Sequence, residues 1–415
     1  MKYFDLKYVD KTYWVLYFAL IFVAVIALFS AGSTLVYERH SVLGPVFSQM
    51  IFLLVGVAIA FLIQFVPSMY IRLAGYPLLL VSMLFLLLLA VLPAGNPLVV
   101  TINGASRWIK IAGIQFQPSE LAKLSLIIVI ADLLTRIKSE DDKRKYFFIT
   151  LSVTAITALL IMPGNLSTAI LLCGIVLIMW FLTRIPWKYI LSVVGIGLLL
   201  LVGGYLFVEF QYVRPHKQMT GPLKRAVTWV GRIDDIFTEH QQDAAEFKLT
   251  DDNYQRSISK VAIARGGKSP IGVLPGNSKE RDFLPQAFAD YIFAIIVEES
   301  GIFGAVFLIF LYMAILFRAC LTSSRFGDNA ATLMVMGLAL MLTCQALVSM
   351  MVAVGLGPVT GQPVPLISRG GTSAVITSVY FGIIMGVSRE QTELRERQNK
   401  TTKESLDEVP EITLE

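Results

Sequence analysis

A few ionisable residues stand inside apolar segments long enough to cross a membrane, and they are the first candidates for chemistry. Glu120 and Lys123 are three residues apart in a helical pattern opened by Pro118, so one helix face would carry both. A charged side chain at the centre of a membrane costs about 2.5 to 3.5 kcal/mol, so each one requires a partner or a function. The pair is therefore either a structural ion pair or the lining of an outward-facing polar cavity for an anionic substrate or a metal.

Three further carboxylates lie where a charged loop leads into an apolar segment. Asp290 stands at the mouth of that segment, and Glu298 and Glu299 follow about two turns later. The helix dipole stabilises a carboxylate in a first turn, which is the ordinary explanation for Asp290. Its position equally suits a carboxylate that serves a bound substrate. Glu298 and Glu299 would either partner buried polar groups or mark a helix kink before Gly301.

Residues 355–373 read GLGPVTGQPVPLISRGGTS, a run too rich in glycine and proline to form a continuous helix. The pattern predicts a re-entrant or surface loop followed by the start of a helix. Glycines followed by Ser or Thr at a helix start can hold phosphate, but a rigid turn has the same pattern. The run by itself leaves both interpretations open.

The composition identifies the solvent around these residues. The 415 residues are 55% hydrophobic and 16% charged, with a mean hydropathy of +0.68. Soluble domains carry about 25% charged residues, so a water-soluble enzyme, a disordered regulator and a collagen-like protein are excluded. The net charge of +5 is small and dispersed, and we expect no nucleic-acid partner. Cys173, Cys320 and Cys344 lie in apolar runs without metal-ligand spacing, so they are expected to be packing residues.

The elements that must position these groups are membrane helices, and the sequence predicts an all-α polytopic membrane protein with about ten of them. The expected spans are residues 13–33, 48–67, 74–93, 117–135, 147–162, 165–183, 189–209, 286–317, 329–353 and 367–387. Basic residues gather between alternate spans, about eighteen against four, which predicts cytoplasmic termini. One large outer loop, about residues 211–285, separates the seventh and eighth spans. Residues 1–389 would form the membrane domain and residues 390–415 a disordered cytoplasmic tail.

Several motifs together resemble a known family. They are NGASRWI (103–109), QPSELAK (117–123), YQ (254–255), GG (266–267), GNS (276–278), FLP (283–285) with Asp290, and PVTGQPVPLIS (358–368) with GG (370–371). Their types and order resemble the SEDS family of bacterial shape, elongation, division and sporulation proteins, which includes FtsW, RodA and SpoVE. The resemblance runs from about residue 13 to Arg389.

The resemblance implies a ten-helix peptidoglycan glycosyltransferase that polymerises lipid II at the outer face of the cytoplasmic membrane. It also implies a class B penicillin-binding protein and other division proteins as partners. Asp290 matches the family's essential aspartate, and Glu120 and Lys123 match its intramembrane charged pair. Loop residues expected to face the substrate are Arg107, Arg225, Gln255, Lys279 and Ser368. Residues 361–373 and 381–390 are more similar to the FtsW division branch than to the RodA elongation branch, which favours a role at the division septum.

The expected mechanism uses Asp290 as the general base, or as the ligand of a divalent metal such as Mg²⁺ or Mn²⁺. Cations of the large loop would neutralise the departing pyrophosphate, and a single base opposite the leaving group predicts inversion to a β-1,4 glycan. A lipid II flippase or transporter is the alternative, with Glu120, Lys123 and Glu298 forming the pathway. A scaffolding subunit that recruits a transpeptidase is a third interpretation.

The chain also departs from the family pattern. An acidic Pro-Asp element between the fifth and sixth spans reads Pro163-Gly164-Asn165 here, which removes a carboxylate. Ile258 replaces a glutamine, and Ala264-Arg265 replaces Gly-Ser, so a role for those positions is in doubt. Phe288 and Ala289 stand where His-Thr is frequent before the aspartate. A histidine proton shuttle is therefore not expected.

Overall fold

The structure, a computed structural model, describes residues 6–31, 43–93, 95–102, 105–111, 113–213, 226–231, 251–275, 277–284, 288, 290–326 and 329–407. The long helices in this part of the chain are α1 (Lys11–Ala31), α3 (Leu43–Ile63), α4 (Ser68–Val91), α5 (Pro118–Leu134), α6 (Glu140–Ile161), α7 (Leu166–Leu182), α8 (Trp187–Val208), α10 (Asp251–Gly266), α11 (Ile292–Phe326), α12 (Ala330–Val354) and α13 (Thr372–Asp407). Shorter elements are η2 (Leu6–Tyr8), η3 (Glu209–Val213), η5 (Glu280–Phe283) and the strands β1 (Val99–Ile102), β2 (Ala105–Ile111) and β3 (Ile114–Phe116).

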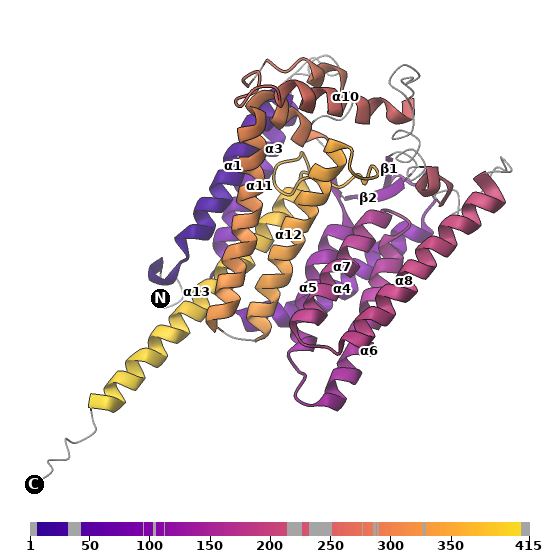
Figure 1. The fold of residues 1–415 in the computed structure, drawn as a ribbon. Coiled ribbons are helices and arrows are strands. Elements are labelled where there is room, and N and C mark those ends of the chain that lie inside the picture. Colours follow the sequence, from indigo (N-terminus) through magenta and orange to yellow (C-terminus); the bar gives the residue numbers. More distant parts are fainter. Residues whose placement is uncertain are drawn as a thin grey trace, which may run out of the picture.

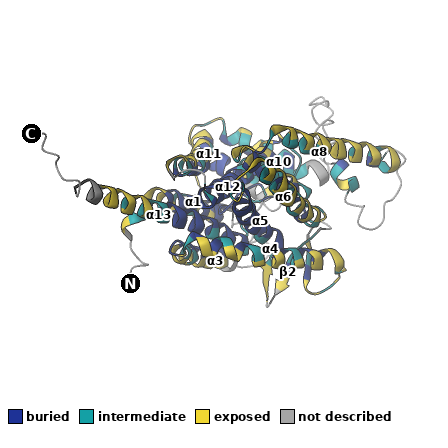
Figure 2. Ribbon diagram, turned by 90° about the horizontal axis from the view of Figure 1, so that it is seen from below, coloured by how far each residue is buried: buried dark blue, intermediate teal, exposed yellow. Residues whose placement is uncertain are grey.

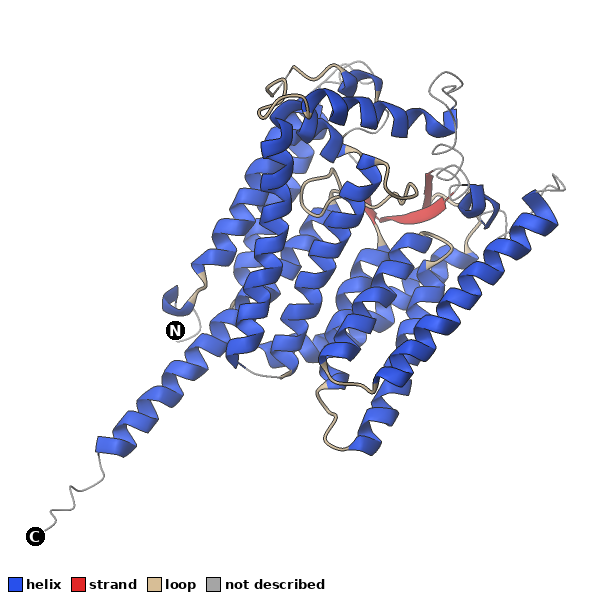
Figure 3. Ribbon diagram, in the orientation of Figure 1, coloured by secondary structure: helices blue, strands red, loops and turns tan. Residues whose placement is uncertain are grey.

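The long helices form a bundle with two distinct ends. Figure 1 shows α10, β1 and β2 at one end, which we call the loop end, and both chain termini toward the other, which we call the terminal end. Figure 3 shows that the strands are confined to the loop end and that helices make up the rest of the bundle. Every predicted span overlaps a helix. Within the described residues, eight of these helices are long and apolar enough to cross a membrane, whereas α5 and α7, with 17 residues each, are shorter than the predicted spans. The polytopic helical fold predicted from the sequence is therefore confirmed.

The most buried helices are α5, α12 and the part of α13 before residue 390. In α5, every residue from Pro118 to Leu134 except Leu121 is buried, so the helix has no face toward lipid. Figure 2 shows α5 and α12 inside the bundle, whereas no residue in the apolar window of α8 is buried. Because other helices surround α5, its ionisable residues are shielded from hydrocarbon and can find protein partners.

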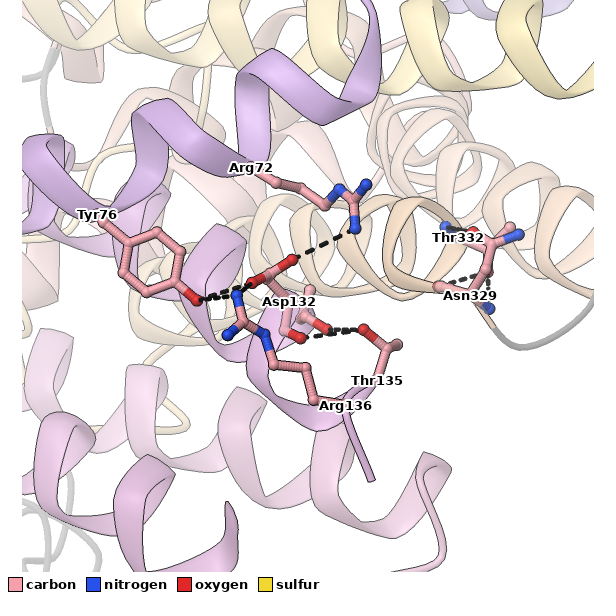
Figure 4. A network of polar contacts seen from close by, with 8 residues as sticks. Arg72, Tyr76, Asp132, Thr135, Arg136, Asn329 and Thr332 are labelled. Atoms are coloured by element: carbon pink, nitrogen blue, oxygen red, sulfur yellow. Dashed lines mark hydrogen bonds and ion pairs between the residues drawn. The ribbon is translucent and has the colours of Figure 1, made fainter. Parts of the chain in front are cut away.

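Asp132, near the terminal end of α5, is an ionisable residue that the sequence analysis did not single out. Its carboxylate accepts hydrogen bonds from the Tyr76 hydroxyl at 2.7 Å and the Arg136 guanidinium at 2.6 Å, and Arg72 pairs with it at 3.3 Å (Figure 4). Arg72 and Tyr76 lie on α4, one turn apart. The network therefore joins α4 to α5 and compensates a carboxylate placed in an apolar segment.

The predicted boundaries that differ most from the structure are those of α11 and α13, and one predicted element class also differs. The helix expected over residues 286–317 begins at Ile292, after turns at residues 288 and 290–291, and continues to Phe326. The tail expected to be disordered from residue 390 is helical as far as Asp407. Arg397 donates to Glu393 one turn before it, and Lys7 binds Glu396, so charge pairs support this extension. A three-stranded antiparallel sheet, in the order β1-β2-β3, adds strand structure to a chain predicted as all helix.

A backbone interlock at the loop end interrupts α11. Gly301 has φ +64° and ψ −159°, so the helix breaks there, as one interpretation of the sequence predicted. Residues 269–274 lie in the break: the N–H groups of Val273 and Leu274 donate to the carbonyls of Glu298 and Glu299, each at 2.9 Å. A Cβ at Gly301 would overlap backbone atoms of residues 269–272. The break therefore requires glycine for both its conformation and its lack of a side chain.

Gly301→Ala is expected to destabilise the protein by about 2 to 4 kcal/mol, because it combines a left-handed conformation with a backbone collision. The measurement is the apparent melting temperature of the detergent-purified protein. Gly197→Ala on α8 is the matched control, because a Cβ there would meet nothing within 4 Å. Equal melting temperatures for the two variants would show that the interlock does not stabilise the fold.

Candidate active site at the loop end

The connection between α12 and α13 organises the loop end. We call residues 355–371 the glycine loop; it contains left-handed glycines at Gly355, Gly361 and Gly371, with φ values of +84°, +61° and +48°. Its backbone is held from several helices: Asn165 Nδ2 donates to the Thr360 carbonyl at 3.1 Å, and the Gly371 N–H donates to Gln49 Oε1 at 3.1 Å. The sequence prediction of a loop followed by a helix start is confirmed.

Arg107, on β2, reaches across the loop end to two other connections. Its Nε donates to the Gly164 carbonyl at 2.8 Å. A Cβ built on Gly361 would lie 2.6 Å from Arg107 Nη1, so the guanidinium lies directly against the glycine loop. Gly164 and Asn165 belong to the element in which the family's acidic residue is absent. In this chain, the Gly164 carbonyl binds Arg107 and the Asn165 amide binds the glycine loop, so both contacts are made by uncharged groups.

The pair of Glu120 and Lys123 is buried beneath the glycine loop. Lys123 Nζ donates to Glu120 Oε1 at 2.8 Å and to Gln345 Oε1 at 2.7 Å, and the two charged residues are 5% and 2% exposed. Gln345, on α12, also donates from Nε2 to the Pro363 carbonyl at 3.0 Å. The geometry therefore supports a structural ion pair that connects α5, α12 and the glycine loop.

Two polar side chains close to this network have polar atoms without hydrogen-bond partners among the described residues. In Gln362, which precedes Pro363, the side-chain nitrogen and oxygen both have no such partner. In Ser349, one helical turn beyond Gln345, the hydroxyl has none. Both residues are buried. A buried polar group without a partner costs about 1 to 3 kcal/mol. The interior beneath the glycine loop is therefore suited to a polar guest, either water or part of a substrate.

Asp290 lies in the turn that leads into α11 and is partly exposed. The glycine loop reaches this turn: the Arg369 N–H donates to the Phe288 carbonyl at 2.9 Å. The Arg369 guanidinium also lies over the Phe288 ring, 5.2 Å from its centroid. A carboxylate and a cation from distant parts of the sequence are thereby brought to one turn at the loop end.

Glu298, two turns into α11, is fully buried and anchors the end of the large loop. It accepts hydrogen bonds from the Ser278 hydroxyl and from the Lys279 backbone N–H at 3.1 Å, and Arg265 Nη1 lies 3.6 Å from its Oε1. The prediction that Glu298 partners buried polar groups is therefore confirmed. Arg265, which replaces a family residue, contributes to this anchor.

The remaining predicted substrate-facing residues have different surroundings. Ser368 is buried, and its hydroxyl accepts the Val364 N–H at 2.9 Å, so it braces a turn of the glycine loop. Lys279 is exposed after the anchored Ser278, and Gln255 is partly exposed on α10. Arg225 lies outside the described residues. The structure thus brings Arg107, the buried pair and Ser368 to one loop, and their substrate-binding roles stay predictions.

The donor set around Asp290 limits how a divalent metal could bind. Among the residues that the structure describes, no group of three or more His, Cys, Asp or Glu side chains is placed to hold a metal. Mg²⁺ commonly binds through one or two carboxylates together with substrate phosphates and water, without a cage made by the protein alone. A single carboxylate such as Asp290 fits that mode of binding when a phosphorylated substrate supplies the other oxygens.

Sequence reasoning missed three residues that organise this end: Asn165, Gln345 and Arg369. Gln345 is a polar residue within an apolar span, and this was a signal that could have found it. Asn165 follows Pro163-Gly164 and caps α7, its side chain accepting the Thr168 N–H at 3.2 Å. Arg369 is one of the four basic residues counted on the outer side, and nothing in its neighbourhood along the chain indicates Phe288 as its contact.

The chain is similar to a known family and to named members of it. The model of the FtsW, RodA and SpoVE family, described as "Cell cycle protein", matches residues 10–393. The probable peptidoglycan glycosyltransferase FtsW of Enterococcus hirae is 30% identical over 75% of each chain, and the peptidoglycan glycosyltransferase MrdB of Escherichia coli K12 is 24% identical over 93% of this chain and 95% of its own.

Solved structures show the same arrangement of helices. A chain from a peptidoglycan synthase complex that coordinates polymerization and crosslinking is 25% identical, with a TM-score of 0.69 over 93% of this chain and 99% of its own. The rod shape determining protein RodA of Thermus thermophilus is 24% identical, with a TM-score of 0.63 over 92% of this chain and 97% of its own. On these matches, over nearly its whole length, the chain belongs to the FtsW, RodA and SpoVE family of membrane proteins.

Proposed function

We propose that this protein is a peptidoglycan glycosyltransferase that polymerises lipid II into β-1,4 glycan strands. The observation that carries the proposal is the position of Asp290: it is partly exposed at the loop end, in a family whose named relatives are peptidoglycan glycosyltransferases. Both substrates are lipid-linked, so the reacting sugars must meet at the surface of a membrane protein. A helix bundle with polar groups gathered at one end provides such a surface.

In the proposed reaction, the Asp290 carboxylate accepts the proton of the acceptor's C4 hydroxyl as the oxygen attacks C1 of the donor sugar. The bond between C1 and the pyrophosphate oxygen breaks, and the pyrophosphate leaves as an anion. Attack opposite the leaving group inverts the configuration at C1. Cationic side chains of the large loop stabilise the negative charge that develops on the leaving group, so no protein acid is required.

A divalent cation, Mg²⁺ or Mn²⁺, is part of the proposal. Asp290 and the substrate's phosphate oxygens would hold it, and it would supply further positive charge for the pyrophosphate. Asp290 would then orient the metal in addition to, or in place of, accepting the proton. Titrating EDTA against Mg²⁺ and Mn²⁺ in the polymerisation assay is expected to remove and restore activity, and full activity in EDTA would contradict the metal.

The proposal includes a role in division and a penicillin-binding partner, and the comparisons support both. The FtsW relative is 30% identical and MrdB 24%, which supports the division branch and a septal location. The match to a chain of a peptidoglycan synthase complex supports a class B penicillin-binding protein as partner, with other division proteins.

We infer an inner-membrane location with cytoplasmic termini and the loop end outside, as the basic residues predict. A fluorescent fusion is expected to gather at the septum, and uniform labelling of the lateral wall would favour elongation.

The direct test of the activity is lipid II polymerisation by the purified full-length protein in detergent or vesicles. Glycan strands longer than the disaccharide, sensitive to a muramidase and detected on a gel, are the expected product. A parallel assay measures movement of labelled lipid II across vesicles. Wild-type protein that moves lipid II across vesicles but makes no glycan, both alone and with its partner, would overturn the proposed glycosyltransferase activity in favour of a transporter.

A further inference from the structure

Arg369 is held beside the turn that carries Asp290 by two independent contacts. Its backbone N–H donates to the Phe288 carbonyl at 2.9 Å, and its guanidinium lies 5.2 Å from the centroid of the Phe288 ring. Phe288 and Asp290 are two residues apart, so Arg369 contacts the same turn that carries the carboxylate. All three residues are partly exposed at the loop end, which is where a lipid-linked sugar would approach.

One of the two contacts between the glycine loop and this turn does not depend on the Arg369 side chain. The hydrogen bond comes from the backbone N–H, which any residue except proline would supply. Stacking on an aromatic ring adds a modest attraction and fixes the plane of the guanidinium. A planar guanidinium presents a fork of N–H donors that matches phosphate oxygens in pairs.

The position of Arg369 in the chain adds to its suitability for an anion. It directly precedes Gly370 and Gly371 and the first turn of α13, a helix of 36 residues. The start of a helix carries partial positive charge, which reinforces the guanidinium. The cations of the large loop belong to a different segment of the chain. Among them, Lys279 is exposed, whereas Arg369 is only partly exposed.

The structure assigns to Arg369 the role of binding the diphosphate of the polyprenyl-linked donor, next to the proposed base. This inference rests on the proposed function and names which cation of the chain meets the leaving group. Phe288 acts as a positioning residue, because it touches the guanidinium and orients its fork. Phe288 stands where a histidine is frequent in the family. In this assignment its aromatic ring orients the Arg369 guanidinium and takes no part in proton transfer.

The kinetic test uses full-length protein and lipid II as substrate. Arg369→Gln is expected to raise KM and lower kcat/KM by about 10-fold to 100-fold, as for the loss of a charged bidentate contact. Arg369→Lys should fall between this variant and wild type, because it keeps the charge and loses the fork. Lys110→Gln is the matched control: it removes an exposed cation of β2 at the same end and is expected to leave KM unchanged.

A binding measurement separates diphosphate binding from a role in positioning Asp290. In EDTA, where no metal links Asp290 to the diphosphate, undecaprenyl pyrophosphate is expected to raise the melting temperature of wild type, Lys110→Gln and Asp290→Asn more than undecaprenyl monophosphate does. Arg369→Gln should lose that difference between the two lipids. The assignment is overturned if Arg369→Gln loses activity but keeps the difference between the two melting-temperature shifts. It is also overturned if Arg369→Gln keeps the wild-type KM, or if wild type shows no difference between the two lipids. Failure of wild type to make glycan while it retains the diphosphate-dependent shift would instead remove the proposed function alone.

Discussion

Asp290→Asn is expected to lower the rate of lipid II polymerisation by about 10²-fold to 10⁴-fold, the usual contribution of a general base. Asparagine has nearly the same shape as aspartate, but its amide accepts no proton at neutral pH and binds a divalent cation weakly. The side chain is partly exposed in a turn before α11, so its replacement should not disturb packing. The rate of glycan formation by the purified protein at saturating lipid II measures the effect.

The control for this change is Asp141→Asn, which alters an exposed carboxylate at the start of α6, toward the terminal end. Its polymerisation rate is expected to equal that of wild type. The Asp290→Asn protein should also keep its melting temperature, which shows that the loss is chemical. Glycan synthesis by Asp290→Asn at the wild-type rate would remove both proposed roles of the carboxylate, as base and as metal ligand.

Lys123→Met is expected to destabilise the protein by about 3 to 5 kcal/mol, because it leaves the buried Glu120 carboxylate without its cation. Lys123 is 2% exposed and donates to both Glu120 and Gln345. Its loss therefore also removes a hydrogen bond from the Gln345 amide, which donates to the Pro363 carbonyl. The expected results are a lower yield of folded protein and a lower melting temperature in detergent, with loss of polymerisation as a consequence.

An exposed pair with the same spacing provides the control. Lys143 and Glu140 are also three residues apart on one helix, and the Glu140 side chain is 81% exposed. Lys143→Met is expected to change stability by less than about 1 kcal/mol, as for other surface ion pairs. The comparison isolates the effect of burial from that of removing a lysine.

A double variant distinguishes the two interpretations of the buried pair that the sequence left open. Glu120→Leu with Lys123→Met removes both charges, and replacing a whole buried pair with apolar residues is often neutral. Because the pair is buried and its groups bond each other and Gln345, we expect the double variant to regain most of the lost stability and to polymerise lipid II. A folded double variant that makes no glycan would show that the pair contacts the substrate.

The helices were the most predictable part of the molecule. A helix satisfies its backbone hydrogen bonds internally, so a run of about 20 apolar residues is enough to predict a spanning helix. The helix ends were less predictable, because charged residues stabilise α13 beyond the membrane pattern, as far as Asp407. The sheet had a local signal that was not used: Asn103-Gly104 is typical of a tight hairpin, and it separates Ile102 from Ala105, which pair across β1 and β2.

The candidate site divides into residues that stand out in the sequence and residues that only their neighbours identify. Asp290, Glu120 and Lys123 stand out because charge is scarce in this chain and expensive inside a membrane. Ser368 was assigned to a substrate-facing surface through its motif, yet its hydroxyl bonds within the glycine loop. The role of a polar side chain depends on its direction, which a motif does not contain.

The sequence by itself determined the solvent, the positions of the helices in the chain and the few carboxylates and cations that such a solvent makes exceptional. Tertiary structure decided which of these groups meet. Lys123 bonds a glutamine 222 positions away, and Arg369 stacks on Phe288 beside Asp290. Hydropathy is a local property that one segment shows alone, whereas an ion pair or a stacked cation exists only after helices distant in the chain have packed. The helices can therefore be read from the chain, and the site exists only in the packed bundle.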